Sequence, residues 1–255
     1  RANAVVVPVN PMNTAEELQH YITDADARVA ITTADLATGL AEASRAVPAS
    51  QQLQHLVISH FADTMPGDVA QQADFPKAWA SWLLTVHAAP SAAQLGDCTV
   101  ATWQQALQCA DAAPPLTVGP SDMAILPYTS GTTGKPKGCV HVHSHILHAA
   151  LAGGIWGRQT TESVNLVVAP MFHITGMVSI MHTLLGAGAT LVVMPRWDRM
   201  LAGSLMTRYR VTHWANIPTM VVDLLASPHL AQQDLPSLVY IGGGGAAMPQ
   251  SVAQR

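Results

Sequence analysis

The chain has 255 residues, of which 49% are apolar and only 11% are charged, and its formal net charge at pH 7 is −4. This length fits one large domain or two small ones, and the composition provides a sizeable core. The slightly acidic balance offers no basic surface, so we expect neither a nucleic-acid partner nor an anionic membrane surface. We also expect no integral membrane segment, because no apolar run approaches the roughly eighteen residues of a membrane span. Three scattered cysteines give neither a disulfide framework nor a metal-binding spacing, which favours a reducing, cytoplasmic compartment.

The first sixty residues alternate between strand and helix patterns. Thr14 and Glu17 have the spacing of a capping box, and the apolar residues that follow lie on one helical face. Thr33 can cap a second helix, which we expect to end near Pro48. The order of these elements predicts a parallel sheet. The strand candidates of this part are Val5–Pro8, Arg28–Thr32 and Gln54–Ser59.

The alternation returns after residue 121 and is clearer there. Most of the strand candidates are continuous apolar runs, as expected of strands buried on both faces. We therefore predict an α/β fold with parallel sheets flanked by helices, divided into subdomains at residues 1–120 and 121–255. The strand candidates are Met123–Tyr128, Asn165–Ala169, Thr190–Met194, Val211–Ala215 and Leu238–Ile241, and the helix candidates are His141–Gly153, Gly176–Gly186, Asp198–Arg208 and Pro218–Ser227, with Asn216 as the cap of the last helix.

Four short loops follow four of these strands. In open parallel α/β sheets, ligands bind beyond the carboxyl ends of the strands. We expect the four loops to lie along one edge of the sheet and to form one composite site. They are Thr129–Gly138, Pro170–Gly176, Asn216–Thr219 and Gly242–Ala247.

The first loop lies in residues 128–138, which read YTSGTTGKPKG. Of the three lysines in the chain, Lys77, Lys135 and Lys137, two lie in this stretch. Glycines allow close approach to the backbone, hydroxyls donate hydrogen bonds and lysines add positive charge, which together suit phosphate oxygens. A flexible linker needs no clustered lysines. A Walker A loop requires four residues between its glycines, but only two separate Gly131 from Gly134.

The same eleven residues resemble the phosphate-binding signature of the adenylate-forming (AMP-binding) superfamily, which includes acyl-CoA synthetases, luciferase and adenylation domains. Over the whole chain the resemblance is greatest to long- or medium-chain fatty-acid–CoA ligases, whose large N-terminal domain is layered as αβαβα subdomains. It implies that ATP is bound with this loop around its β- and γ-phosphates, and that Lys137 acts in catalysis. The residues implied at the ATP site are Thr129, Ser130, Gly131, Thr132, Thr133, Gly134, Lys135 and Lys137.

Two further stretches resemble signatures of this superfamily. Phe172 and His173 match a Phe-His pair that borders the carboxylate-binding pocket, where His173 would orient the carboxylate or gate the acyl tunnel. The run Gly242–Ala247 resembles the Gly-Gly-Ala-Pro loop that contacts adenine and the acyl group, although Ala247 replaces the usual proline. The resemblance implies substrate contacts from Gly243 and adenine contacts from Gly244, Gly245 and Ala246. A dinucleotide-binding oxidoreductase is a weaker alternative, because the G-x-G-x-x-G spacing is absent.

The stretch 141–148 contains four histidines. On a helix, His141, His145 and His148 would share one face. Without cysteine or carboxylate companions, they are a weak zinc candidate, and we predict no protein metal site.

The resemblance implies that a carboxylate attacks the α-phosphate of ATP to give acyl-AMP and pyrophosphate, and that coenzyme A then displaces AMP. Mg²⁺ would bridge phosphate oxygens. The family's Tyr-Gly-x-Thr-Glu signature and its C-terminal catalytic lysine are not found, so we expect a fragment of a longer enzyme that is inactive alone. An enzyme that loads a carrier protein or an amine, and a non-catalytic nucleotide-binding module, stay open as alternatives. A homodimer is a further option for the assembly.

Overall fold

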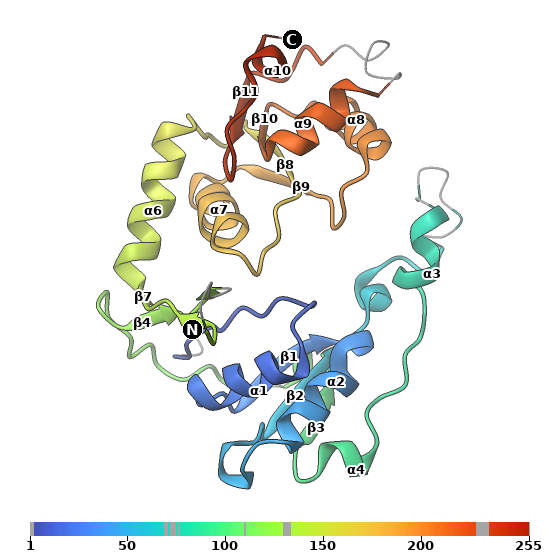
Figure 1. Ribbon diagram of the computed structural model, residues 1–255, viewed down its shortest axis with the longest axis vertical. Helices are drawn as coiled ribbons and strands as arrows, with labels where there is room; N and C mark the ends of the chain where they lie inside the picture. The colour runs from blue at the N-terminus through green and yellow to red at the C-terminus, as the bar shows by residue number, and fades with distance from the viewer. Residues whose placement is uncertain are drawn as a thin grey trace. The chain divides into compact units, whose positions relative to one another are not determined.

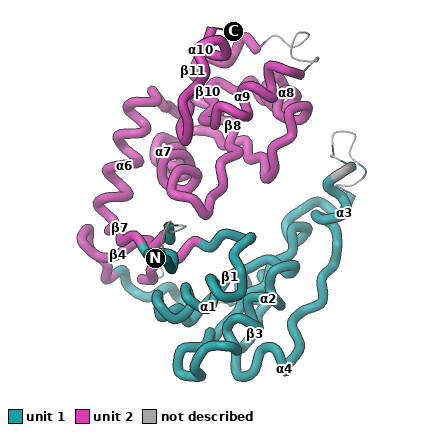
Figure 2. The backbone as a smooth tube through the Cα atoms, in the orientation of Figure 1, with its two compact units in different colours: residues 1–2, 9–116, 128–138 teal, residues 3–8, 117–127, 139–255 magenta. Residues whose placement is uncertain are grey.

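The structure is a computed structural model that describes residues 3–68, 71, 75, 77–109, 111–129, 134–227 and 235–254 (Figure 1). The chain forms two compact units (Figure 2). Unit 1 comprises residues 1–2, 9–116 and 128–138, and unit 2 comprises residues 3–8, 117–127 and 139–255. Among the helices of the described residues, none combines the length and hydrophobicity that crossing a bilayer requires.

Unit 1 begins with helix α1 (Ala15–Asp24), whose N-terminus is the predicted capping box. The Thr14 hydroxyl accepts a hydrogen bond from the Glu17 backbone N–H, and the Glu17 carboxylate accepts one from the Thr14 N–H. The two groups satisfy backbone donors that the first helical turn leaves unpaired. This prediction is confirmed.

The sheet of unit 1 contains three parallel strands in the order β1-β2-β3, namely Val29–Thr33, His55–Ser59 and Thr99–Thr102. Helix α2 (Ala34–Arg45) connects the first two, and its Ala37 packs with Leu56 and Ile58. Thr33 lies at the N-cap of α2 as predicted, but its side chain makes no capping hydrogen bond. The remaining described elements are short: η1 Ala49–Gln51, η2 Phe61–Thr64, η4 Lys77–Trp79, α3 Ala80–Leu83, α4 Ala92–Leu95 and α5 Trp103–Leu107.

The sheet of unit 2 has four parallel strands in the order β11-β10-β8-β9. Its central strands are buried on both faces, as the apolar runs predicted. Val167 packs with Ile180 and Leu184 on one face, whereas Leu166 pairs with Trp214 on the other. The strands are β8 Val164–Val167, β9 Thr190–Val193, β10 His213–Asn216 and β11 Tyr240–Gly243, and the helices are α6 His143–Trp156, the π-helix η5 Thr175–His182, α7 Thr183–Ala187, α8 Arg199–Arg208, α9 Pro218–Leu225 and α10 Gln250–Ala253.

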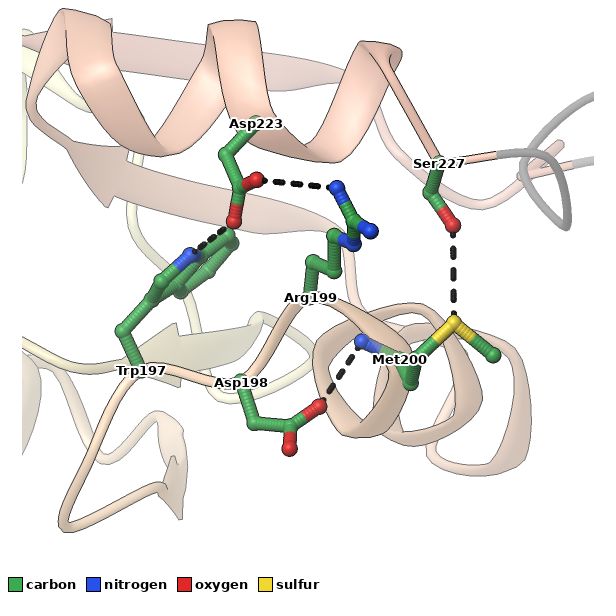
Figure 3. Close-up of polar contacts among 6 residues, drawn as sticks. All are labelled: Trp197, Asp198, Arg199, Met200, Asp223 and Ser227. Carbon is green, nitrogen blue, oxygen red and sulfur yellow. Dashed lines mark hydrogen bonds and ion pairs between the residues drawn. The ribbon is translucent and has the colours of Figure 1, made fainter.

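Helices α8 and α9 are joined by the carboxylate of Asp223 (Figure 3). It accepts hydrogen bonds from the Trp197 indole N–H at 2.7 Å and from the Arg199 guanidinium at 3.2 Å. The Trp197 ring also stacks on Trp214, with ring centroids 5.7 Å apart. Asp198 caps α8 by accepting from two backbone N–H groups. These contacts fix the two helices against strand β10.

The predicted strand Met123–Tyr128 is wrong as one buried parallel strand. It is divided into β4 (Met123–Ile125), which pairs antiparallel with β7 (His141–Val142), and β5 (Tyr128–Thr129), which pairs antiparallel with β6 (Lys137–Gly138). Pro127 lies at the break, because it has no N–H with which to continue a ladder. The predicted first strand contributes one parallel bridge, between Val6 and Ile125.

The two compact units interleave along the chain. The predicted division at residue 120 places 128–138 in the second segment, whereas this stretch clusters with unit 1. The reason is local packing, since the Tyr128 ring stacks on Tyr21 of α1. The subdomain boundaries of the parent fold stay a prediction.

Burial of His213 in β10 predicts a pH-dependent stability. Burial lowers the pKa of this histidine, and its hydrogen bond to the Gly157 carbonyl offsets that only in part. The folded state therefore favours the neutral ring, and the unfolded state binds more protons below its pKa of about 6.5. The stabilisation from neutral His213 is complete above that pH and is lost as the pH falls.

We expect the free energy of unfolding, measured by urea titration, to fall from pH 7.5 to pH 5.5. His213→Gln should make this decrease with pH smaller. Equal slopes in both proteins would contradict this prediction.

Candidate functional site

The glycine- and lysine-rich stretch forms a hairpin in unit 1. Strands β5 and β6 pair Tyr128 with Gly138 and Thr129 with Lys137. The predicted site residues Ser130, Gly131, Thr132 and Thr133 lie outside the described residues. The structure therefore describes the base of the loop and its second arm.

Helix α1 holds both arms of this hairpin. The Tyr128 ring stacks on Tyr21 with centroids 4.1 Å apart, and its hydroxyl donates to Asp24 at 2.6 Å. On the other arm, the Pro136 carbonyl lies 2.7 Å from Nε2 of His20, which donates to it. Burial and the Asp24 carboxylate raise the pKa of Tyr128, so its hydroxyl stays protonated as a donor. Sequence reasoning missed these three α1 residues, because they lie over a hundred residues from the loop.

The two lysines of the loop are free to meet an anion. Lys135 and Lys137 are both exposed, and neither forms an ion pair within the part of the chain that the structure describes. Thr129 and Gly134 are exposed as well. A loop with two unpaired ammonium groups and small residues suits phosphate oxygens, because the charges need not first leave a protein partner.

In unit 2, the turn after β8 carries Phe172 and His173. Phe172 is half-buried and His173 is exposed. Nδ1 of His173 accepts the Thr175 backbone N–H at 3.2 Å. In the neutral ring the proton is therefore on Nε2, which remains available as a hydrogen-bond donor. This geometry suits the predicted orienting of a carboxylate and does not suit a general base at Nε2.

Gly176 closes this turn by close backbone packing. A Cβ at this position would lie 2.2 Å from the Pro170 carbonyl oxygen and 2.8 Å from that of Ala169. No side chain fits against backbone atoms at such distances. The π-helix η5 starts next to this contact, and π-helical turns are frequent at functional sites.

The glycine run extends from the end of β11. The Gly244 N–H donates to the Asn216 carbonyl at 3.2 Å, so the run continues alongside the end of β10. Gly245 has φ +82°, a conformation that glycine adopts without strain. Gly243, Gly244, Gly245 and Ala246 are all exposed. The prediction that Asn216 caps the next helix is wrong: Ile217 is the N-cap of α9, and the Asn216 side chain donates to the Trp214 carbonyl instead.

Three of the four predicted loops share one edge of the unit 2 sheet. The loops after β8, β10 and β11 follow the carboxyl ends of neighbouring parallel strands. The fourth, the lysine-rich loop, connects an antiparallel pair and belongs to unit 1. The expectation that it follows a strand of the same sheet is wrong, because Pro127 separates it from β4. The composite site stays a prediction.

The histidine-rich stretch does not form the predicted shared helical face. His141 lies in β7, and α6 begins at His143. The rings of His141 and His145 are perpendicular, with centroids 6.4 Å apart. Within the described ranges, no group of three or more His, Cys, Asp or Glu side chains could hold a metal ion.

The sequence profile of one protein family matches the chain over residues 1–255, and that family is described as AMP-binding enzyme. The chain belongs to the AMP-binding enzyme family. The predicted superfamily membership is thus confirmed, as is the α/β fold class with parallel sheets.

Curated relatives of this chain include acid–CoA ligases. The chain is 31% identical over 136 residues to a long-chain-fatty-acid–CoA ligase of Bacillus subtilis, a match that covers 52% of this chain and 24% of the ligase. It is 32% identical over 140 residues to a 4-coumarate–CoA ligase of Pinus taeda, covering 53% of this chain and 26% of that enzyme. The matched region thus spans about a quarter of each curated relative.

Solved structures show the same fold over nearly the whole chain. The N-terminal domain of FACL13 from Mycobacterium tuberculosis matches with a TM-score of 0.64 and 23% identity, covering 98% of this chain and 53% of that one. The anthranilate CoA ligase AuaEII, solved with anthranoyl-AMP, matches with a TM-score of 0.66 and 24% identity, covering 98% of this chain and 42% of that one. The fold is therefore that of the N-terminal domains of these enzymes.

Proposed function

We propose that this chain provides the ATP- and acid-binding part of an enzyme that activates a carboxylic acid to acyl-AMP and then transfers the acyl group to coenzyme A. The observation that carries the proposal is the hairpin loop with two exposed, unpaired lysines, held at its base by α1, in a chain of the AMP-binding family. The names of the relatives, which are ligases for long-chain fatty acids and for 4-coumarate, support the acid–CoA ligase reaction.

In this proposal the lysine-rich loop holds the β- and γ-phosphates of ATP. Lys135 and Lys137 neutralise the charge that builds on the departing pyrophosphate, and the hydroxyls and N–H groups of residues 129–134 donate to its oxygens. The loop thereby keeps the leaving group in line with the attacking carboxylate. Mg²⁺, bound as Mg-ATP, would supply further positive charge to the triphosphate beside Lys135 and Lys137. The resemblance assigns the catalytic role to Lys137, and pairing in strand β6 fixes its backbone.

The acid and the adenine would bind at the carboxyl edge of the unit 2 sheet. The Nε2–H of His173 would donate to the substrate carboxylate, with Phe172 and Gly243 beside the acyl group. Gly244, Gly245 and Ala246 would contact adenine. Exposed glycines permit this close approach, since no side chain stands between the backbone and a flat ring.

We infer a fatty acid as the substrate from the resemblance of the whole chain and from the long-chain ligase among the relatives. Aryl acids are the second candidate for the substrate, because the similar enzymes include ligases for 4-coumarate and anthranilate. We place the enzyme in the cytoplasm and keep a homodimer as an option. Because the Tyr-Gly-x-Thr-Glu signature does not occur in the sequence, we propose that the chain alone is a poor catalyst.

Titration calorimetry with Mg-ATP, followed by acid-dependent ATP–pyrophosphate exchange, tests this proposal. We expect binding of Mg-ATP by the chain and exchange far below that of a whole synthetase. Absence of Mg-ATP binding would overturn the proposed function. Exchange at the rate of a whole enzyme would overturn only the proposal that the chain alone is a poor catalyst.

The alternative functions differ from this proposal either in the molecule that accepts the acyl group or in having no catalytic activity. Acyl transfer to a carrier protein or an amine but not to coenzyme A, measured with the longer enzyme, would favour the carrier-loading adenylating enzyme. Mg-ATP binding with no turnover in any longer form would favour the nucleotide-binding module.

A further inference from the structure

One polar atom at the carboxyl edge of the unit 2 sheet has no partner. Asn216 is 8% exposed, and its Oδ1 is buried without a hydrogen bond to any described residue. Its Nδ2 donates to the Trp214 carbonyl at 3.3 Å. That contact fixes the orientation of the amide, because an amide flipped by 180° would place Oδ1 of Asn216 against the Trp214 carbonyl oxygen, and both are acceptors.

A second buried asparagine of the same sheet shows the contrast. Asn165 in β8 is 5% exposed, and its amide exchanges two hydrogen bonds with Gln159, at 3.0 and 3.1 Å. Buried side-chain acceptors are normally paired in this way, and an unpaired one destabilises the folded state. The unpaired Oδ1 of Asn216 therefore requires a reason.

Oδ1 of Asn216 lies beside the glycine run. A Cβ built on Gly243 would lie 3.5 Å from Oδ1, and the nearest other side chain is the terminal methyl of Met248, 4.0 Å from that Cβ. Gly243 to Gly245 are exposed beside it, and Ile217 is 45% exposed. A methionine side chain is flexible and moves at low cost. A ligand group packed on the Gly243 backbone would thus lie close to Oδ1 and to the flexible Met248 side chain.

We propose that Oδ1 of Asn216 accepts a hydrogen bond from a hydroxyl or amino group on the acyl part of the substrate, so that the enzyme selects carboxylic acids that carry such a donor. This inference rests on the proposed function and narrows its substrate class. A site built to hydrogen-bond a substrate group discriminates against the analogue that lacks it, because the buried acceptor is then left unpaired. Among fatty acids, a hydroxylated chain would accordingly be preferred over a plain alkyl chain, and among aryl acids, a hydroxy- or amino-substituted ring over an unsubstituted one.

The test uses non-hydrolysable acyl-sulfamoyl adenosines in titration calorimetry with the full chain. The matched probes are the benzoyl compound and its 2-hydroxy, 3-hydroxy, 4-hydroxy and 2-amino derivatives, together with an alkanoyl compound and its terminally hydroxylated derivative. We expect at least one donor-bearing probe to bind roughly three- to tenfold more tightly than its parent, the contribution of one neutral hydrogen bond. Asn216→Leu should remove this ratio, whereas Asn165→Leu should keep the ratio.

Equal affinities within every pair would overturn the inference while leaving the proposed function intact. If no adenylate analogue and no Mg-ATP binds, the proposed function fails as well. Loss of affinity for ATP but not for purine riboside triphosphate in Asn216→Leu would assign the donor to the adenine amino group, and the inference would be wrong. Should Asn216→Leu not fold, the ratios of the unmodified chain decide the question alone.

Discussion

We expect Gly176→Ala to lower the free energy of unfolding by about 3 kcal/mol, the upper end of the usual cost of overpacking. The added methyl would lie 2.2 Å from the Pro170 carbonyl oxygen, and its neighbours are backbone atoms that cannot rotate away. The turn after β8 would have to open, and the position of His173 depends on that turn through its N–H donating to Pro170 O. Urea titration followed by tryptophan fluorescence measures the change.

Gly186→Ala is the matched control. This glycine lies in α7 of the same unit, and a Cβ there has no atom within 4 Å. Alanine favours helix over glycine by about 0.5–1 kcal/mol, so this variant should be as stable as the unmodified chain or slightly more stable. Similar midpoints for Gly176→Ala and Gly186→Ala would show that the turn does not need a glycine.

The parallel sheets could be predicted because short stretches of consecutive residues determine their strands. The run 166–169, which begins in β8, is apolar over four consecutive residues, as expected of a strand buried on both faces. The capping box of α1 is likewise set by two residues three positions apart. From such elements the carboxyl edge with Phe172, His173 and the glycine run follows by topology alone.

The rest depends on contacts between residues far apart in the sequence. Tyr128 reads as the end of an apolar strand, but its hydroxyl bonds with Asp24, 104 positions away, and this packing places the lysine-rich loop with unit 1. Asn216, two residues before Pro218, has the residue type of a helix cap, whereas β10 continues to Asn216 and buries its amide. Neither outcome is encoded in the local pattern, because each depends on which distant element is packed alongside.

We expect Lys137→Ala to weaken Mg-ATP binding by about 1.5–3 kcal/mol, the contribution of a charge-assisted hydrogen bond. In the dissociation constant this is an increase of roughly ten- to over a hundredfold. The effect should be large because the ammonium group has no ion-pair partner among the described residues and its backbone is fixed in β6 opposite Thr129. Titration calorimetry at two ionic strengths measures it, and the loss should shrink at high salt as screening weakens the charge.

Lys77→Ala is the control for this prediction, since Lys77 is the one lysine of the sequence outside the loop. It removes the same charge from the chain, so a general effect of net charge would appear equally in both variants. If Lys137 binds phosphate, only the Lys137 variant should lose affinity for Mg-ATP.

Lys137→Arg adds a second distinction, because it keeps the positive charge but replaces a compact ammonium group with a planar guanidinium group. Rescue by arginine would mean that the site uses Lys137 for its charge, and failure of rescue would mean that it requires a single donor at that point. An isotherm of Lys137→Ala identical to that of the unmodified chain would remove this residue from the phosphate site, and with it the main support for nucleotide binding by the hairpin.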